Sequence, residues 1–138
     1  METVVVVQAD SETRERYAGW LRQAGYEVAT CGGPEALDFA CPVLKYCGCI
    51  DCEQSDAMVY DPCLVSQRAH PASERIIYRL REWYPDKPII LVDRGEIPPG
   101  LTRMLGEDAG VTLLQDPEPE SLASAVQVAL RDVKATAG

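Results

Sequence analysis

Four aspartates follow or end apolar runs of the chain and could do chemistry together. Asp10 comes just after VVVVQA, Asp61 follows AMVY, Asp93 ends IILVD and Asp116 follows VTLLQ. Such runs are typical of strands buried in a parallel sheet, and the carboxyl ends of parallel strands meet at one edge. We therefore expect these acids to converge in an acidic pocket. Carboxylates so placed either bind a hard cation such as Mg²⁺ or Ca²⁺, or raise one another's pKa.

Each of these acids also has a simpler structural interpretation. Asp10 precedes a helical pattern and can serve as its N-cap. Asp116, before Pro117, suits the cap of the last helix, and Asp93 suits a turn. Because no cation-binding loop motif accompanies the acids, both interpretations stay open.

A second candidate site is a cluster of cysteines. Cys41, Cys47, Cys49 and Cys52 follow the pattern C-x5-C-x-C-x2-C. Four thiolates this close could surround one tetrahedral Zn²⁺ or hold an iron–sulfur cluster. Only the last pair has the C-x2-C spacing that is usual in structural zinc sites, so disulfide pairing and inert thiols remain alternatives.

The remaining reactive side chains suggest no catalytic set. Cys31 and Cys63 should lie at the opposite end of the sheet from the cysteine cluster. His70, the only histidine, lies in a polar loop, where a histidine usually titrates in solvent. No Ser-His-Asp set, phosphate-cradling glycine loop or basic aromatic patch is present, so we do not predict an enzyme.

Composition narrows the class of partner and the compartment. The formal net charge is −9, from 13 basic and 22 acidic residues, which argues against binding nucleic acid or an anionic membrane surface. No apolar run approaches the roughly 20 residues of a membrane-spanning helix, and the N-terminus lacks the basic region of a signal peptide. We therefore expect a cytoplasmic protein. Disulfides rarely persist in the reducing cytoplasm, so the six cysteines of the chain need another explanation.

Apolar runs alternate with helical patterns along the chain. Gly25 should end the first helix, which begins after Asp10, because glycine favours the left-handed conformation at a helix end. A stretch at about 41–56 has no regular pattern and is interpreted as an insertion of about ten residues. The expected strands are 3–9, 26–31, 57–61, 88–93 and 111–115, and the later helical patterns are 35–40, 76–84, 101–107 and 122–133.

This alternation predicts one α/β domain over residues 1–138. Strands that alternate with helices form a parallel sheet with helices on both faces. We expect a flavodoxin-like, doubly wound sheet of five strands in the order 2-1-3-4-5. An antiparallel central pair would contradict this prediction.

The chain resembles bacterial response-regulator receiver domains over nearly all of its length. The opening VVVVQADSETRERYAGWLRQAGYEV is similar to their first βαβ unit, and AMVYDP to the third strand with its phospho-accepting aspartate. PIILVDRG resembles the fourth strand, and LLQDPEPESL the fifth strand and its turn. The spacing of these segments is the strong part of the resemblance.

The resemblance also implies which residues would accept phosphate. Asp61 matches the phospho-accepting aspartate, but Gln8 and Ala9 stand where receivers have an acidic pair that holds Mg²⁺. Asp93 stands at the Thr or Ser position and Asp116 at the Lys position. An aspartate at the Lys position replaces a cation with an anion at the phosphoryl site. Two like charges about 4 Å apart near a surface repel by roughly 4 kcal/mol. We therefore expect inefficient phosphotransfer to Asp61. That Asp61 is only a structural remnant is the alternative interpretation.

Three functions follow as hypotheses. The leading one is a degenerate receiver of a two-component system that signals by binding a histidine kinase or an output protein. By analogy with the family, its surface would be the fourth strand, the 101–107 helix, and the fifth strand with its helix. The alternative is a metal-binding or redox-sensing domain that uses Cys41, Cys47, Cys49 and Cys52. The third is a working phospho-receiver with a rearranged pocket.

Overall fold

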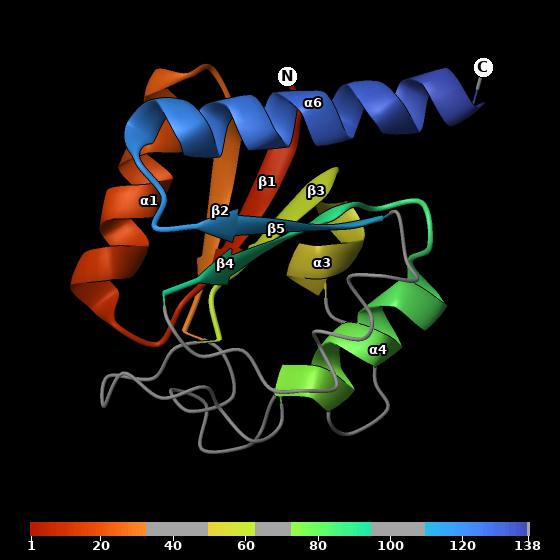
Figure 1. Cartoon of the computed structure of the whole chain (residues 1–138), viewed down its shortest axis with the longest axis horizontal. Coiled ribbons are helices and arrows are strands. Elements are labelled where there is room, and N and C mark those ends of the chain that lie inside the picture. The colour runs from red at the N-terminus through yellow and green to blue at the C-terminus, as the bar shows by residue number, and fades with distance from the viewer. Residues whose placement is uncertain (33–49, 63–72, 95–109, 138) are drawn as a thin grey trace.

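The computed structural model describes residues 1–32, 50–62, 73–94 and 110–137 of the chain (Figure 1). The predicted helices over 35–40 and 101–107 lie outside the described residues. Among the described residues, no helix is long and apolar enough to cross a membrane. The elements are β1 Thr3–Val7, α1 Ser11–Gln23, β2 Glu27–Cys31, α3 Ile50–Gln54, β3 Ala57–Tyr60, α4 Ser73–Trp83, β4 Ile89–Asp93, β5 Val111–Gln115 and α6 Pro119–Ala137.

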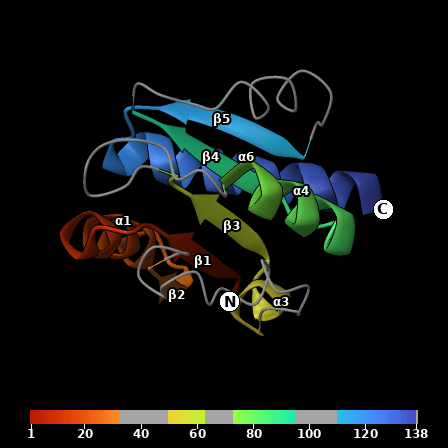
Figure 2. The same ribbon diagram turned by 90° about the horizontal axis from the view of Figure 1, so that it is seen from below.

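The five strands form one sheet in the order β2-β1-β3-β4-β5, and every neighbouring pair is parallel (Figure 2). This confirms the predicted topology. The register places the last residue of β1, Val7, beside Cys31 of β2 and Tyr60 of β3. The carboxyl ends of these strands therefore meet at one edge of the sheet, where Asp61 follows β3.

Two apolar layers, one on each face of the sheet, make up the core. Helices α1 and α6 cover one face, and α3 and α4 cover the other (Figure 1). Alternate residues of each central strand point to opposite layers, which is why the buried positions of β1, β3 and β4 are apolar. The α1/α6 layer contains Val4, Val6, Tyr17, Leu21, Ala57, Val59, Ile90, Val92, Leu122, Val126, Ala129 and Leu130. The α3/α4 layer contains Val5, Val7, Cys52, Met58, Tyr60, Ile76, Ile77, Leu80, Ile89, Leu91 and Val111.

Helix α1 begins and ends at the residues that the sequence indicates. The Asp10 carboxylate accepts a hydrogen bond from the backbone N–H of Thr13 at 3.0 Å, so Asp10 is its N-cap. Gly25 has a φ of 101°, and its N–H donates to the carbonyl of Arg22. The next N–H, of Tyr26, donates to Leu21, which completes a glycine-based helix end. Both predictions are confirmed.

The end of the cysteine stretch is helical, which corrects the prediction that it has no regular structure. Residues Ile50–Gln54 form the short helix α3, and its Cys52 side chain is buried in the α3/α4 layer. The carbonyl of Cys52 accepts hydrogen bonds from the Ser55 hydroxyl at 2.8 Å and from the Lys87 ammonium at 2.9 Å; Lys87 also donates to the Glu53 carbonyl. Tertiary capping by a cation therefore stabilises a helix too short to show a periodic pattern.

Asp116 does not cap the last helix, and that prediction is wrong. Helix α6 begins at Pro119, which takes the first helical position instead of Pro117. The N–H of Glu118 donates to the Ser121 hydroxyl at 2.8 Å, so the side-chain cap comes from inside the helix. Asp116 instead adopts a φ of 41° in the turn after β5.

Candidate functional site

The centre of the site is Asp61, which follows β3 at the carboxyl edge of the sheet. Its backbone N–H donates to the carbonyl of Val7 at 2.9 Å, so it extends the pairing between β1 and β3 by one residue. Only 3% of the residue is exposed. A carboxylate buried to this extent is stable as an anion only with hydrogen-bonding or charged partners.

Two side chains supply such partners from different elements. The Tyr17 hydroxyl, on α1, donates to Asp61 Oδ2 at 3.1 Å, and Arg94 Nε, just after β4, lies 3.2 Å from the same oxygen. The Asp61 side chain has 0% exposure and that of Arg94 has 29%, so the ion pair is largely shielded from water. Asp61 is therefore already bound to one cation that belongs to the chain itself.

The environment of Tyr17 keeps its hydroxyl protonated. Burial raises the pKa of Tyr17, and the negative charge of Asp61 raises it further, while Arg94 acts in the opposite direction. The phenol is thus a permanent hydrogen-bond donor to the carboxylate at physiological pH.

Asp10 lies within the field of the same arginine. Its carboxylate accepts hydrogen bonds from the Thr13 hydroxyl at 2.6 Å and the Thr13 N–H at 3.0 Å. These two bonds are the main reason that the pKa of Asp10 is lowered, and the charges of Arg94 and Arg16 add to the effect. The mutual raising of pKa values that we expected among clustered acids is therefore wrong for Asp10.

Gln8 directly follows β1, at the position where the resemblance to receivers led us to expect an acid. Its side-chain oxygen accepts from the N–H of Asp10 at 2.8 Å, and its carbonyl accepts from Arg14 at 2.8 Å. The residue is fully buried, and its side-chain nitrogen has no hydrogen-bond partner among the residues that the structure describes. The edge of the sheet beside Asp61 therefore presents a neutral donor and not a carboxylate.

The other two acids of the predicted pocket are Asp93, at the end of β4, and Asp116, just after β5, and each forms a contact with the neighbouring strand. Asp93 Oδ2 lies 3.4 Å from the side-chain nitrogen of Gln115, and the Asp93 carbonyl accepts from the N–H of Asp116 at 3.1 Å. Among residues 1–32, 50–62, 73–94 and 110–137, no three His, Cys, Asp or Glu side chains are placed to hold one metal ion. Arg94 instead acts on two of the acids: it forms an ion pair with Asp61, and its charge helps to lower the pKa of Asp10.

Most of the cysteine cluster lies outside the described residues, as do Cys63 and His70. Cys52 belongs to α3, and Asp56 just after that helix donates its N–H to the carbonyl of Thr3 at 2.7 Å. Because Thr3 begins β1, this end of the stretch lies at the amino edge of the sheet, as predicted. Cys31 ends β2 at the opposite edge.

Sequence reasoning missed the roles of Arg94 and Tyr17. Arg94 follows Asp93 directly at the carboxyl edge, and a basic residue at that place was the available signal. Tyr17 fits the apolar stripe of α1, and its ring does lie in the core. Nothing in its spacing shows that the hydroxyl reaches Asp61.

Comparison with known proteins gives a fold but no closer relationship. No protein-family model and no curated protein matches the chain. A CheY-like response regulator receiver domain protein from Methanospirillum hungatei has a TM-score of 0.71 at 14% identity, with 99% of this chain and 98% of that one covered. A receiver domain protein from Clostridium thermocellum has a TM-score of 0.70 at 17% identity, with 99% of both chains covered.

A third similar structure is a response regulator receiver protein from Sinorhizobium medicae, with a TM-score of 0.69 at 17% identity and 96% of each chain covered. The strand order and these structural similarities together define the fold class of the chain. The chain has the flavodoxin-like α/β fold of response-regulator receiver domains.

Proposed function

We propose that the chain is a receiver-like signalling module that works in the cytoplasm by binding a protein partner. It catalyses no reaction, and Asp61 is not efficiently phosphorylated. The observation that carries this proposal is the pairing of the buried Asp61 carboxylate with Arg94 and Tyr17. The partner class implied by a receiver fold is a histidine kinase or an output protein.

Access to the nucleophile supports the proposal. A carboxylate attacks a phosphoryl group only when an oxygen faces the donor, yet the Asp61 side chain has 0% exposure. A donor reaches it only after the contacts with Arg94 and Tyr17 open. Removing one partner of a buried ion pair typically costs about 3–5 kcal/mol. Opening this pair should cost less than that, because Arg94 is 29% exposed, but the opening still precedes any attack by Asp61.

The charges around Asp61 point the same way. Phosphoryl transfer needs cations that neutralise the developing negative charge, and receivers use Mg²⁺ and a lysine for this. Here Arg94 supplies one positive charge directly to Asp61, while the neutral Gln8 and the acidic Asp116 stand at the metal-binding and lysine positions. In our proposal Arg94 takes the place of the divalent cation, so the pocket is charge-compensated without phosphate or metal.

The test is exposure of the intact protein to acetyl phosphate and Mg²⁺, followed by intact-mass spectrometry. We expect no stoichiometric adduct on the wild type, and Asp61→Asn should behave identically. The combination Ala9→Asp with Asp116→Lys should move the domain toward accepting phosphate, because it restores an acid and a cation. A stoichiometric, Mg²⁺-dependent adduct that disappears in Asp61→Asn would refute the proposal and favour a working phospho-receiver.

A second candidate function is sensing of a metal or of redox state by Cys41, Cys47, Cys49 and Cys52. The supporting observation is that Cys52 is 5% exposed on a helix end held by Ser55 and Lys87. A thiol fixed at the boundary of the core would anchor a thiolate site and couple its occupancy to folding.

A further inference from the structure

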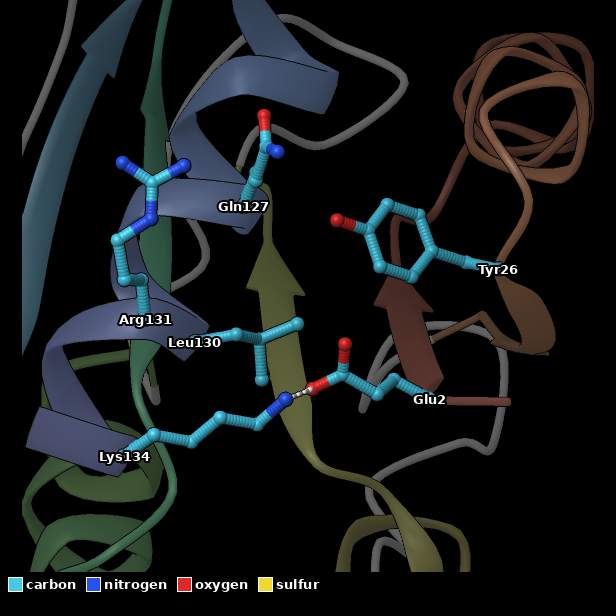
Figure 3. A pocket seen from close by; sticks show the side chains of 6 residues that line it. All are labelled: Glu2, Tyr26, Gln127, Leu130, Arg131 and Lys134. Atoms are coloured by element: carbon cyan, nitrogen blue, oxygen red, sulfur yellow. Dashed lines mark ion pairs between the residues drawn. The ribbon is translucent and has the colours of Figure 1, made fainter. Parts of the chain in front are cut away.

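A hollow lies between helix α6 and the turn from α1 to β2, at the opposite end of the sheet from Asp61. Its volume is about 230 Å³ (Figure 3). One wall comes from α6, and the other from the residues that precede β1 and β2. The lining residues are Glu2, Tyr26, Gln127, Leu130, Arg131 and Lys134.

The hollow carries an uncompensated positive charge. The Lys134 ammonium lies 3.3 Å from a carboxylate oxygen of Glu2, so these two charges balance each other. Within the described part of the chain, no ion pair or hydrogen bond engages the guanidinium of Arg131. The net positive charge is notable because the whole chain has a formal charge of −9.

Hydrogen-bond donors and an apolar floor complete the hollow. Gln127 and Arg131 are one turn apart on α6, so their side chains extend from the same face. The Tyr26 hydroxyl points toward α6 from the other wall (Figure 3). Burial raises the pKa of Tyr26, and nearby Glu2 raises it further, so the phenol stays a donor. Leu130, 6% exposed, supplies apolar surface between them.

We propose that this hollow binds the carboxylate of a glutamate or aspartate side chain presented by a protein partner. One unpaired guanidinium matches a monoanion, and its planar fork suits a carboxylate. Leu130 and the Tyr26 ring can cover the methylene groups of an acidic side chain. Glu2 shows that a glutamate already fits against Lys134 at this place.

The surroundings favour a protein over a small molecule. A neighbouring hollow along β2 shares Tyr26, so the surface continues past the first one. Tyrosine and arginine are also the residue types that most often dominate protein interfaces. The second hollow is lined by Thr3, Arg22, Tyr26, Glu27, Val28 and Ala29.

The experiment is an NMR titration of the ¹⁵N-labelled protein with N-acetylglutamic acid α-amide, whose only carboxylate is on the side chain. We expect saturable shifts of the Gln127 side-chain amide and of backbone amides around Tyr26 and Arg131. The matched neutral probe, N-acetylglutamine α-amide, should give none. Arg131→Gln should weaken binding by on the order of tenfold, the effect of losing one charged contact.

A matched control is Arg75→Gln, which removes an exposed arginine from α4 and should titrate like the wild type. The assignment fails if the acidic probe gives no saturable shift, if the neutral probe binds equally, or if Arg131→Gln changes nothing. Tighter binding of N-acetylglycine would identify a C-terminal carboxylate as the ligand, and tighter binding of inorganic phosphate a free anion. Either result would also overturn the proposal that the ligand is an acidic side chain. None of these outcomes depends on whether Asp61 accepts phosphate.

Discussion

At the scale of single residues, Arg94 determines how Asp61 is interpreted, because it places a positive charge beside that buried carboxylate. An acid without a cation would leave a buried, uncompensated charge at Asp61, whereas the pair with Arg94 makes that charge tolerable inside the domain. Tyr17 adds a hydrogen bond to the same oxygen and ties α1 to the end of β3. The site is thus arranged to keep one carboxylate ionised and enclosed, which is the opposite of what an accessible nucleophile needs.

The energetic coupling of Arg94 and Asp61 can be measured with a double-mutant cycle. Arg94→Met should lower the free energy of unfolding, with about 3–5 kcal/mol as an upper limit because the Arg94 side chain is 29% exposed. In the Asp61→Asn background the same change should cost less, since no buried charge is left unpaired. Urea unfolding of the four proteins gives a coupling of about 0.5–3 kcal/mol if the residues interact.

The control for this cycle is Arg75→Met, an exposed arginine on α4 that should have little effect in either background. Strictly additive effects of Arg94→Met and Asp61→Asn would mean that the ion pair does not exist in solution.

At the scale of elements, α1 and α6 each begin where a polar side chain accepts a hydrogen bond from a backbone N–H at the helix start. Asp10 does this for α1, and the Ser121 hydroxyl does it for α6. The local sequence predicted the first cap because one acid precedes one apolar pattern. It did not predict the second, because DPEPES offers two prolines and an internal serine, and only the tertiary path of the chain decides between them. Helix α3 was missed because its capping by Lys87 joins residues far apart in the chain.

The charge of the α1 cap should make stability depend on pH. The pKa of Asp10 is lower in the folded protein than its ordinary value of 3.8, mainly through the Thr13 hydroxyl. The ionised carboxylate therefore stabilises the fold above that ordinary value, and this contribution disappears as pH falls through the lowered pKa. Asp10→Asn keeps a capping oxygen but removes the charge, so it should lower the melting temperature at pH 7 more than at pH 3.

Thermal unfolding followed by circular dichroism at several pH values checks this. Asp10→Ala should be less stable than Asp10→Asn at every pH, because it removes the cap as well. A difference between the wild type and Asp10→Asn that is constant across pH would contradict a contribution from the charge.

At the scale of the whole molecule, the sheet was predictable because each strand is a short apolar run that a turn or helix signal bounds. Four valines in β1 and the IILV of β4 have few alternatives to burial on both faces. The topology brought Asp61 to the carboxyl edge as expected. Side-chain direction was not predictable, so Arg94 and the Tyr17 hydroxyl were found only in three dimensions. The two ends of the sheet now carry separate candidate sites, a closed ion pair and an open positive hollow.

Metal analysis of the cysteine cluster tests whether the protein has a function besides the proposed binding of a partner. We expect protein purified without oxygen to carry about one zinc or iron per chain if the four thiolates form a site. A chelator should then lower the melting temperature of the wild type, because thiolate coordination contributes to folding free energy. Cys49→Ser should lose both the metal and the chelator effect, whereas Cys31→Ser, at the opposite edge of the sheet, should lose neither. Cys52→Ala separates ligation from packing, because it keeps an apolar side chain at this buried position of α3. Six freely reactive thiols and no metal would remove the sensor hypothesis and leave the protein-binding receiver as the only proposed function.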